Sequence, residues 1–271
     1  MSEDSEPAEN ISGGPDGGGV ASAFEPGEAA TRAEAVVDRL GQRYWQKTYG
    51  GQDAFECLVR TVLSQNTSDK ASQPAHDALL ARFGGEGDLA EALAAAAHAE
   101  LADTIRHAGL YNQKAETLIR LAERVLAEYG SATGFDDFVR EEPPEAVRGA
   151  LLDLTGVGPK TADCVLLFAS GQAGVFPVDT HVHRIYRRLG VAPPDADHET
   201  VRAVLEREVP AAKCGFGHTA SIQFGREYCT ARQPACLDGP EACPLSDVCE
   251  QVGVDVATGE VVDPGDAPDR N

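Results

Sequence analysis

Apolar residues recur along most of the chain at the spacing of a single helix face, and each recurrence predicts an amphipathic helix. The clearest sets are Val36, Leu40 and Tyr44, then Phe55, Val59 and Leu63, then Ala115, Ile119 and Leu126. Glycines follow where such patterns stop, at Gly84, Gly109, Gly130 and Gly190, as expected at helix ends. Alternating strand patterns joined by tight hairpin turns do not occur. We therefore expect an all-α protein of about ten short helices, and we read the alanine-rich run at residues 90–97 as helix.

Both ends of the chain lack such patterns. Residues 1–28 and 253–271 are rich in Gly, Pro, Ser and acidic residues, a composition typical of disordered tails. The longest apolar stretches are far shorter than the roughly 20 residues of a membrane span. The first residues, Met-Ser-Glu-Asp-Ser-Glu, do not resemble a secretory signal. We therefore expect a cytoplasmic protein with no membrane partner.

The charge of the chain at first argues against a nucleic-acid partner, because 44 acidic residues against 23 Lys plus Arg give a net charge of −21. Residues 1–30 carry seven acids and no base, and residues 251–271 carry five acids and one Arg, so these ends hold −7 and −4 and leave −10 to the body. Lysine is rare beside arginine, five against 18, which resembles proteins from a high-salt cytoplasm. At about 1 M salt the Debye length is ~3 Å, so distant acids barely repel a phosphate backbone. We interpret the acids as a solvated, halophilic surface.

Two glycines predict a tight turn between two helices. Residues 151–162, LLDLTGVGPKTA, indicate a helix, a turn at Gly156-Val157-Gly158 and a second helix that begins near Pro159. Backbone N–H groups in such a turn can hold a phosphate without a charged side chain. A Gly-x-Gly turn alone is more often a plain connection. Asp179 follows 19 residues after Lys160 as a predicted helix cap; taken singly, each would be a structural residue, and their joint placement favours catalysis.

Four ordered motifs together resemble the endonuclease III family of DNA glycosylases. They are Leu-x-Gly-Val-Gly-x-Lys-Thr-Ala at residues 154–162, Val-Asp-Thr-His-Val at 178–182, Gly-Leu-Tyr-Asn-Gln-Lys-Ala-Glu at 109–116 and Leu-Ser-Gln-Asn-Thr at 63–67. Four matches in the same order are much more specific than any one of them. With the cysteines described below, the resemblance covers roughly residues 51–250.

The resemblance implies an all-α fold of two helical domains with a DNA cleft between them. A six-helix barrel domain would span residues 49–172, with a helix-hairpin-helix motif at about 147–169, and an iron-sulfur domain would combine residues 29–48 with 173–252. We expect a monomer that binds double-stranded DNA with a damaged base or an abasic site. The DNA-binding residues would be Gly156, Val157 and Gly158 in the hairpin, Leu110 as a wedge, and Gln65 or Asn66 in the hole left by the flipped nucleotide.

The resemblance also gives Lys160 and Asp179 their chemical roles. Lys160 would attack C1′ of the sugar as the base leaves, forming a Schiff base that permits β-elimination of the strand. An amine must be neutral to attack, and desolvation, with a cationic neighbour such as Arg184, would favour that form. Asp179 would stabilise the cationic sugar and move protons. Relatives that only remove a base usually lack this lysine, so we expect a bifunctional glycosylase and lyase, with oxidised pyrimidines as substrates.

Four of the seven cysteines lie within 21 residues, separated by six, six and five positions: Cys229, Cys236, Cys243 and Cys249. Four thiolates in one short segment suit a [4Fe–4S] cluster. Structural zinc is the alternative, but the usual Cys-x2-Cys knuckle does not occur. The family spacing is six, two and five, so the middle gap has four extra residues here, in a turn-forming segment at 237–242. Residues 226–250 carry two Arg against five acids, so we do not expect this cysteine segment to contact DNA as it does in relatives.

Two other functions remain open from the sequence. A monofunctional mismatch or adenine glycosylase would share the fold and the cluster, and a non-catalytic helix-hairpin-helix protein would bind DNA without cutting it. Thr155 and Pro159 stand where the family often has Pro and Arg, and the missing Arg would weaken the grip on DNA. Intact Lys160 and Asp179 favour the bifunctional enzyme over both alternatives.

Overall fold

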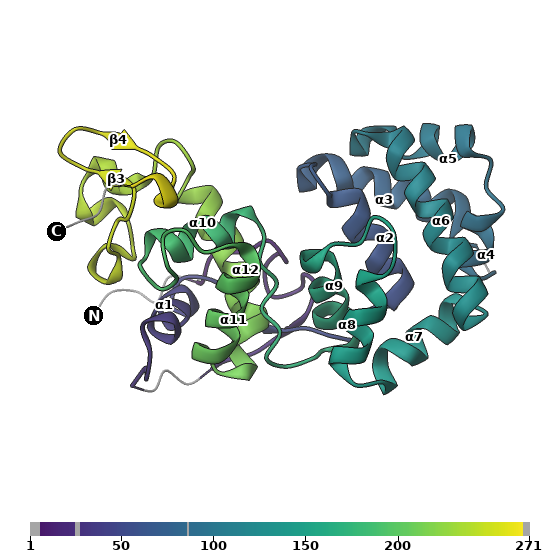
Figure 1. Ribbon diagram of the computed structural model, residues 1–271, viewed down its shortest axis with the longest axis horizontal. Helices are drawn as coiled ribbons and strands as arrows, with labels where there is room; N and C mark the ends of the chain where they lie inside the picture. Colours follow the sequence, from purple (N-terminus) through teal and green to yellow (C-terminus); the bar gives the residue numbers. More distant parts are fainter. Residues whose placement is uncertain (1–5, 25–27, 86, 268–271) are drawn as a thin grey trace. The chain divides into compact units, whose positions relative to one another are not determined.

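Helices make up nearly all of the regular structure, as the hydrophobic pattern predicts (Figure 1). The computed structural model describes residues 6–24, 28–85 and 87–267. The chain divides into two compact units: a middle unit of residues 50–172, and a terminal unit that combines residues 1–49 with 173–271. The all-α prediction is confirmed, and two minimal two-stranded sheets are added to it. Among the described helices, none is both long and apolar enough to cross a membrane.

Helix α2 (Ala54–Ser64) forms the centre of the middle unit. Asp53 caps it by accepting the N–H of Glu56 at 2.8 Å, and eight of its 11 residues are buried. It packs against α3 (Asp69–Phe83), α6 (Tyr111–Tyr129), α7 (Ala132–Glu141) and α9 (Pro159–Val165). The unit also contains α4 (Leu89–Ala94), α5 (His98–Thr104), α8 (Pro144–Leu152), the 3-10 turn η1 (Arg106–Ala108) and the π-helical turn η2 (Leu166–Ser170).

The alanine-rich run does not form the single helix that its composition favours. Helix α4 ends at Ala94, and Ala97 has an extended backbone that caps the start of α5. Both short helices pack against α6. Buried Leu93 on α4 and buried Leu101 on α5 show why the chain turns, because a straight helix cannot bring both apolar faces onto one neighbour.

Helix α12 (Ala211–Glu227) forms the centre of the terminal unit, with 12 of its 17 residues buried. Small residues let its neighbours approach, since a Cβ at Gly217 would lie 2.7 Å from the ring of Phe176. It packs against α1 (Arg32–Gly41), α10 (Thr180–Arg188), α11 (His198–Glu208) and strand β2 (Lys47–Thr48). The unit also contains strands β1 (Val20–Ala21), β3 (Val254–Asp255) and β4 (Glu260–Val261) and the 3-10 turns η3 (Ala235–Asp238), η4 (Pro240–Ala242), η5 (Ser246–Val248) and η6 (Pro264–Asp266).

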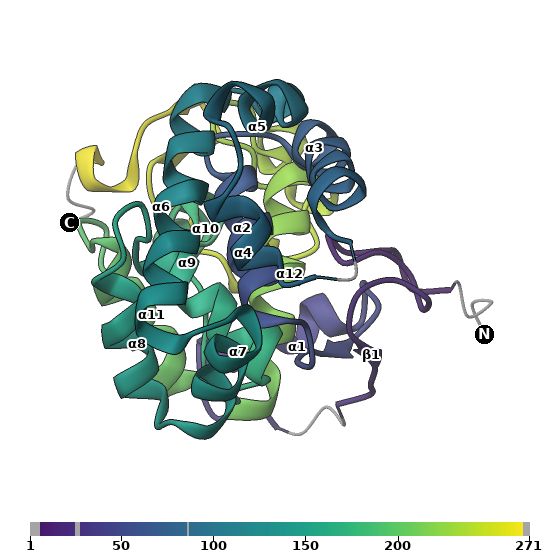
Figure 2. The ribbon, with the colours of Figure 1, turned by 90° about the vertical axis from the view of Figure 1, so that its right-hand side faces the viewer.

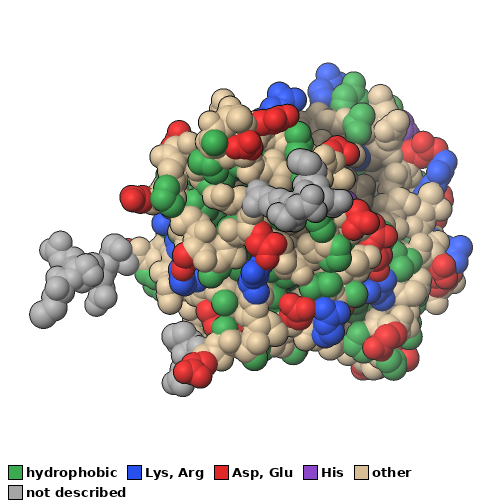
Figure 3. All heavy atoms as spheres, turned by 60° about the vertical axis from the view of Figure 1, so that its left-hand side comes forward, with side chains coloured by type: hydrophobic (Ala, Val, Ile, Leu, Met, Phe, Trp, Pro, Cys, Tyr) green, Lys and Arg blue, Asp and Glu red, His purple; other side chains and the backbone are tan. Residues whose placement is uncertain are grey.

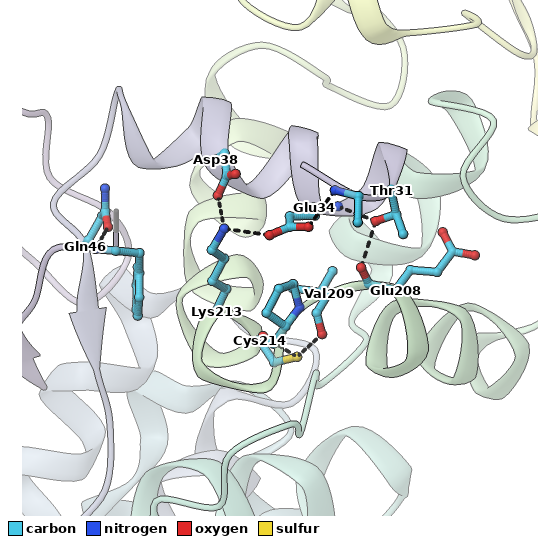
Figure 4. A network of polar contacts seen from close by, with 11 residues as sticks. Thr31, Glu34, Asp38, Gln46, Glu208, Val209, Lys213 and Cys214 are labelled. Atoms are coloured by element: carbon cyan, nitrogen blue, oxygen red, sulfur yellow. Dashed lines mark hydrogen bonds and ion pairs between the residues drawn. The ribbon is translucent and has the colours of Figure 1, made fainter. Parts of the chain in front are cut away.

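A buried ion network joins α1 to α12 (Figure 4). The Nζ of Lys213 donates to Glu34 at 2.9 Å and to Asp38 at 2.6 Å, and all three side chains are largely buried. Hydrogen bonds from Lys213 and from the N–H of Ala30 lower the pKa of Glu34. Burial alone would lower the pKa of Lys213, but its two carboxylate partners outweigh burial and raise it. The network therefore fixes α1, near the start of the chain, against the central helix of its unit.

The ends of the chain differ from the disordered tails that their composition suggests. Residues 6–24 form a loop that includes β1, which pairs with β2, and Figure 2 shows this segment in purple. The ammonium of fully buried Lys47 donates to the carbonyl oxygens of Ser12 and Gly18, so the loop supplies the acceptors that a buried charge requires. At the other end β3 pairs with β4, and Asp263 accepts from Arg187 at 2.5 Å. Residues 1–5, 25–27 and 268–271 of the predicted tails and their flanks lie outside the described residues.

Candidate active site and cysteine cluster

The predicted hairpin joins α8 to α9 in the middle unit. Gly156 has a φ of +95°, a backbone conformation that side chains rarely adopt. The N–H of Val157 donates to Leu154 O at 3.0 Å and closes the turn, so this amide is already used. Gly158 has open space around its Cα and directly precedes Pro159, the first residue of α9. The local sequence thus forms the turn as predicted, and Gly158 is a position of the turn where a Cβ would meet no neighbour.

A buried ion pair braces the two helices of the hairpin. Arg148 on α8 donates through Nε to Asp163 on α9 at 2.7 Å, and the Asp163 side chain is only 2% exposed. The hairpin also lies against α6, because a Cβ at Gly156 would come within 2.6 Å of Thr117 Cγ2. Neither contact was foreseen from the sequence, since pairing across helices cannot be read from helical spacing.

Lys160 is the second residue of α9, directly after the hairpin. The Lys160 residue is partly buried. Its charge lowers the pKa of the Cys57 thiol on α2 by a small amount. Burial raises the pKa of that thiol to about 12, and the nearby charge of Lys160 counters only part of this effect. The amine therefore lies beside the apolar interface between α2 and α9, at the positive end of the α9 dipole.

Asp179 caps α10 in the terminal unit, as its sequence position predicts. Its Oδ1 accepts the N–H groups of His181 and Val182, both at 2.8 Å. Its Oδ2 accepts no hydrogen bond from the described part of the chain. The carboxylate is thus oriented by one oxygen and keeps the other for a further partner. Because Lys160 belongs to the middle unit, its action with Asp179 on one sugar stays a prediction.

Arg184, one turn further along α10, donates hydrogen bonds to the cysteine segment. Its Nη2 donates to Cys229 O at 2.7 Å and its Nε to the same oxygen at 3.1 Å. Burial lowers the pKa of this guanidinium. These hydrogen bonds of Arg184 link α10 to the start of the cysteine segment, and its suggested influence on Lys160 stays a prediction.

Gln65 and Asn66 are the two candidates for the polar residue that would occupy the space left by the flipped nucleotide. Their surroundings differ. The Nε2 of Gln65 donates to Gly156 O and to Thr161 Oγ1, both at 3.1 Å. Gln65 therefore connects the end of α2 to the hairpin. Asn66 is exposed and has a φ of +53° in the left-handed region.

Leu110 precedes α6 and is 55% exposed, although it is a large apolar residue. Its backbone is left-handed, with a φ of +46°, and Gly109 before it has a φ of +61°. An exposed leucine held in a strained loop is unusual for a residue that only packs. Its geometry suits the wedge role that the resemblance suggests.

Lys114 is a residue of this region to which the sequence analysis gives no role. It lies on the buried face of α6, in line with Leu118, Leu121 and Val125. Its Nζ donates at 2.7 Å to Leu63 O, to Thr67 Oγ1 and to Ala108 O. A lysine within an apolar helix stripe was the signal in the sequence that could have identified it.

The four clustered cysteines line one hollow of about 410 Å³ in the terminal unit, together with apolar side chains such as Phe224 and Leu245. None of these four cysteines forms a disulfide within the described residues, and Cys57, Cys164 and Cys214 are buried as small core residues. Burial raises the pKa of Cys236 and Cys243 and raises that of Cys249 to about 12. Thiols in such surroundings become thiolates when they bind a metal group.

The donor set of this hollow fits an iron-sulfur cluster better than a zinc ion. Zinc draws its sulfurs to about 2.3 Å, yet no three His, Cys, Asp or Glu side chains of the described residues converge on a point where one ion could bind. Hydrogen bonds reach the sulfurs, from Gln251 N–H to Cys249 Sγ at 3.3 Å and from Arg188 Nη1 to Cys229 Sγ at 3.6 Å. Such donors stabilise the negative charge of thiolate-bound clusters.

The extra residues between Cys236 and Cys243 form two short turns, η3 and η4, joined at Gly239. Gly239 has a φ of +115°, and a Cβ there would meet nothing within 4 Å. The insertion is thus a compact surface turn, and both flanking cysteines still line the hollow.

Comparison with known proteins defines the class of this fold and site. Residues 59–211 match the HhH-GPD superfamily base excision DNA repair proteins, and residues 229–249, from the first clustered cysteine to the last, match the iron-sulfur binding domain of endonuclease III. The first match covers more than half of the chain. The class is therefore that of the HhH-GPD base excision repair proteins.

Individual relatives narrow the class. Endonuclease III of Thermotoga maritima is 33% identical over 198 residues, which cover 73% of this chain and 83% of the relative, and that of Bacillus subtilis is 31% identical over 198 residues, 73% and 81%. A solved structure of a trapped endonuclease III–DNA covalent intermediate is 30% identical with a TM-score of 0.62, covering 75% of this chain and 86% of that one. The chain belongs to the endonuclease III family of base excision repair DNA glycosylases. Its cofactor is a [4Fe–4S] cluster, and the segment that matches the iron-sulfur binding domain contains the four clustered cysteines.

Proposed function

We propose that this glycosylase is bifunctional, removing a damaged base and then cutting the strand as an abasic-site lyase through Lys160. The observation that carries the proposal is the amine at the second residue of α9, directly after the hairpin. The positive end of a helix dipole disfavours an ammonium, by about 0.3–1 kcal/mol at an exposed position. Attack on C1′ requires the neutral form of this amine, and α9 packs against α2 beside it.

The proposed reaction uses Lys160 and Asp179 on one deoxyribose. The lone pair of Nζ forms a bond to C1′ while the bond from C1′ to the base breaks, and its electron pair leaves with the base, which takes up a proton. Opening of the sugar ring then gives an iminium between Nζ and C1′. Loss of a C2′ proton expels the 3′ phosphate, and water finally releases the lysine. Asp179, oriented through Oδ1, would stabilise the cationic sugar through Oδ2.

The proposed partner is double-stranded DNA that contains a damaged base or an abasic site. Gly158 would present its backbone to a phosphate, because Val157 already uses its N–H within the turn. Leu110 would insert as a wedge into the base stack of the DNA. Asn66 rather than Gln65 would occupy the space left by the flipped nucleotide. Gln65 is engaged by the hairpin, whereas Asn66 is exposed. Two solved endonuclease III structures at 30% identity contain DNA, one non-covalent and one trapped as a covalent intermediate, which supports both the partner and the amine.

Borohydride trapping tests the lyase. Purified holoenzyme and duplexes that carry oxidised pyrimidines, an abasic site or mismatched bases are mixed with borohydride, and covalent protein–DNA adducts are resolved on a denaturing gel. We expect adducts with oxidised pyrimidines and with the abasic site, all lost in Lys160→Ala. Lys70→Ala removes an exposed lysine from α3 and serves as the matched control, which should trap like the native protein. Base release without any adduct would instead support a monofunctional glycosylase.

We also propose that the enzyme works inside cells at high ionic strength. Acidic and basic side chains are interspersed on the face shown in Figure 3, and the chain as a whole carries −21. At about 1 M salt charges beyond ~3 Å are screened, so the acids cease to oppose DNA binding. Trapping should then improve as KCl rises toward this range. A monotonic fall from low salt, as for a basic DNA-binding protein, would contradict the proposal.

A further inference from the structure

Two loops of the middle unit hold non-glycine residues in the left-handed backbone region. Asn66 lies in the loop after α2, and Leu110 lies in the loop before α6. In the described chain Gln251 is the third such residue, far along in the terminal unit. A strained backbone persists where its surroundings hold it in place, and such strain gathers at functional positions. Both loops therefore need contacts that hold their backbones in place.

Lys114 connects these two loops directly. Its ammonium has three N–H donors, and each finds an acceptor at 2.7 Å: Leu63 O and Thr67 Oγ1 on either side of Asn66, and Ala108 O just before Gly109 and Leu110. The hydroxyl of Thr67 also donates to Ala108 O. Lys114 and Thr67 therefore form one bonded group that spans both loops.

The burial, the charge and the hydrogen-bond acceptors of Lys114 indicate that it is more than a packing residue. The side chain is 5% exposed, and no carboxylate of the described residues pairs with it, so it is not half of a salt bridge. Burial lowers the pKa of Lys114 to about 8, which still leaves it mainly protonated near neutral pH. A buried charge without a counter-ion is costly. Its three acceptors lie within three residues of Asn66 or Leu110, the two residues proposed to enter DNA.

We propose that Lys114 is a positioning residue for nucleotide flipping, holding the Asn66 loop and the Leu110 loop together so that both enter the duplex as one rigid element. This rests on the proposed function, in which Asn66 and Leu110 engage the DNA. Lys114 itself touches neither the sugar nor the base. Its effect should appear in base displacement and in turnover on stacked duplex, and much less in turnover on DNA that needs no unstacking.

The first experiment compares Lys114→Met with the native holoenzyme on a lesion in duplex DNA and on an abasic site in single-stranded DNA. We expect kcat/KM on the duplex to fall by about 100-fold, the size of effect seen when a reacting geometry shifts by about 1 Å. Cutting of the single strand should change less than threefold. Arg124→Met removes a positive charge from the exposed face of α6 and should leave both rates unchanged. Equal losses on both substrates would overturn the proposal.

A binding measurement separates this proposal from the chemistry. In the Lys160→Gln background, 2-aminopurine beside a reduced abasic site reports unstacking as a rise in fluorescence. Adding Lys114→Met should remove most of that rise at saturating protein. An undiminished rise would overturn the positioning role. Failure of the native protein to trap on any DNA would instead count against the lyase, while this signal still tests Lys114.

Thr67→Val tests the linkage if Lys114→Met folds poorly, as judged by its cluster absorbance and its thermal unfolding. Valine keeps the shape of Thr67 and removes the hydroxyl shared by Lys114 and Ala108. We expect the same pattern of duplex loss, about tenfold, and a double variant no worse than Lys114→Met alone, because coupled residues are not additive. If the losses of Thr67→Val and Lys114→Met were fully additive in the double variant, the two side chains would not act as one hydrogen-bonded group.

Discussion

The Asn66 and Leu110 loops of the middle unit and the cysteine segment of the terminal unit are held by different means. Lys114, Gln65 and the Arg148–Asp163 pair fix the loops and the hairpin with bonds from the chain itself. The cysteine segment consists of short 3-10 turns around a hollow. The comparison indicates that the first region is preorganised by protein contacts, whereas the second depends on its cofactor. Each prediction below tests this difference, from the largest expected effect to the smallest.

Removal of the cluster should have the largest effect and should be confined to the terminal unit. Cys236→Ser removes one ligand, and we expect loss of the visible absorbance of the cluster and of cooperative unfolding in the terminal unit, because metal-binding free energy is folding free energy. The measurements are absorption spectra and hydrogen exchange resolved by unit. Cys57→Ala, in the middle unit, should keep the cluster. Unchanged protection around α12 after cluster loss would show that the segment does not need its cofactor.

Loss of the hairpin brace should be the next largest effect. Arg148→Ala removes the ion pair to the buried carboxylate of Asp163, and we expect the free energy of unfolding of the middle unit to fall by about 3–5 kcal/mol. Denaturant melts followed by circular dichroism give this value. Arg120→Ala breaks an exposed pair with Glu116 and should cost no more than about 1 kcal/mol. Similar losses in both variants would mean that the hairpin is not braced by this pair.

Two glycines of the hairpin should separate folding from DNA contact. Gly156→Ala places a methyl group against Thr117 at a φ of +95° and should destabilise the middle unit by about 1–3 kcal/mol. Gly158→Ala meets open space at an ordinary φ and should stay within about 0.5 kcal/mol. It should nevertheless weaken binding of abasic duplex, measured by fluorescence anisotropy. Normal DNA affinity in Gly158→Ala would remove this glycine from the phosphate seat.

The smallest effect should be an acid dependence confined to the terminal unit. Because the folded pKa of Glu34 is lowered, its contribution to stability is present above the unfolded value near 4.5 and is lost as pH falls through the lowered folded pKa. Glu34→Gln should therefore flatten the loss of stability below about pH 4.5, measured by thermal melts across pH. Glu116→Gln, in an exposed pair, should leave the slope unchanged. Parallel slopes in native protein and Glu34→Gln would contradict the network.

Much of the fold and the site could be predicted because it depends on local sequence. Helical spacing gives the all-α class, and Gly84 and Gly130 end α3 and α6 as expected. Asp179 caps α10 because it directly precedes Thr180, the first residue of that helix, and its side chain accepts backbone N–H groups of the first turn. The family motifs then predict the cysteine segment and the iron-sulfur cofactor, both of which the comparisons bear out. The paired action of Lys160 and Asp179 remains a prediction.

The rest depends on contacts between distant residues. The ion pair of Arg148 with Asp163 and the loop contacts of Lys114 need two helices to be placed, which spacing along one helix does not give. The alanine-rich run divides because α6 packs against both halves. At the N-terminus, the glycines and Pro15 that suggest disorder by composition lie in turns of the described residues 6–24.

The buried ammonium of Lys47 has a practical consequence for work on this protein. A shortened chain that starts at residue 29, as the composition of the first residues invites, would remove Ser12 and Gly18 and leave that charge without its acceptors. Such a chain would also lose strand β1, which pairs with β2. Affinity tags are therefore better placed ahead of residue 6, with the glycine-rich loop intact behind them.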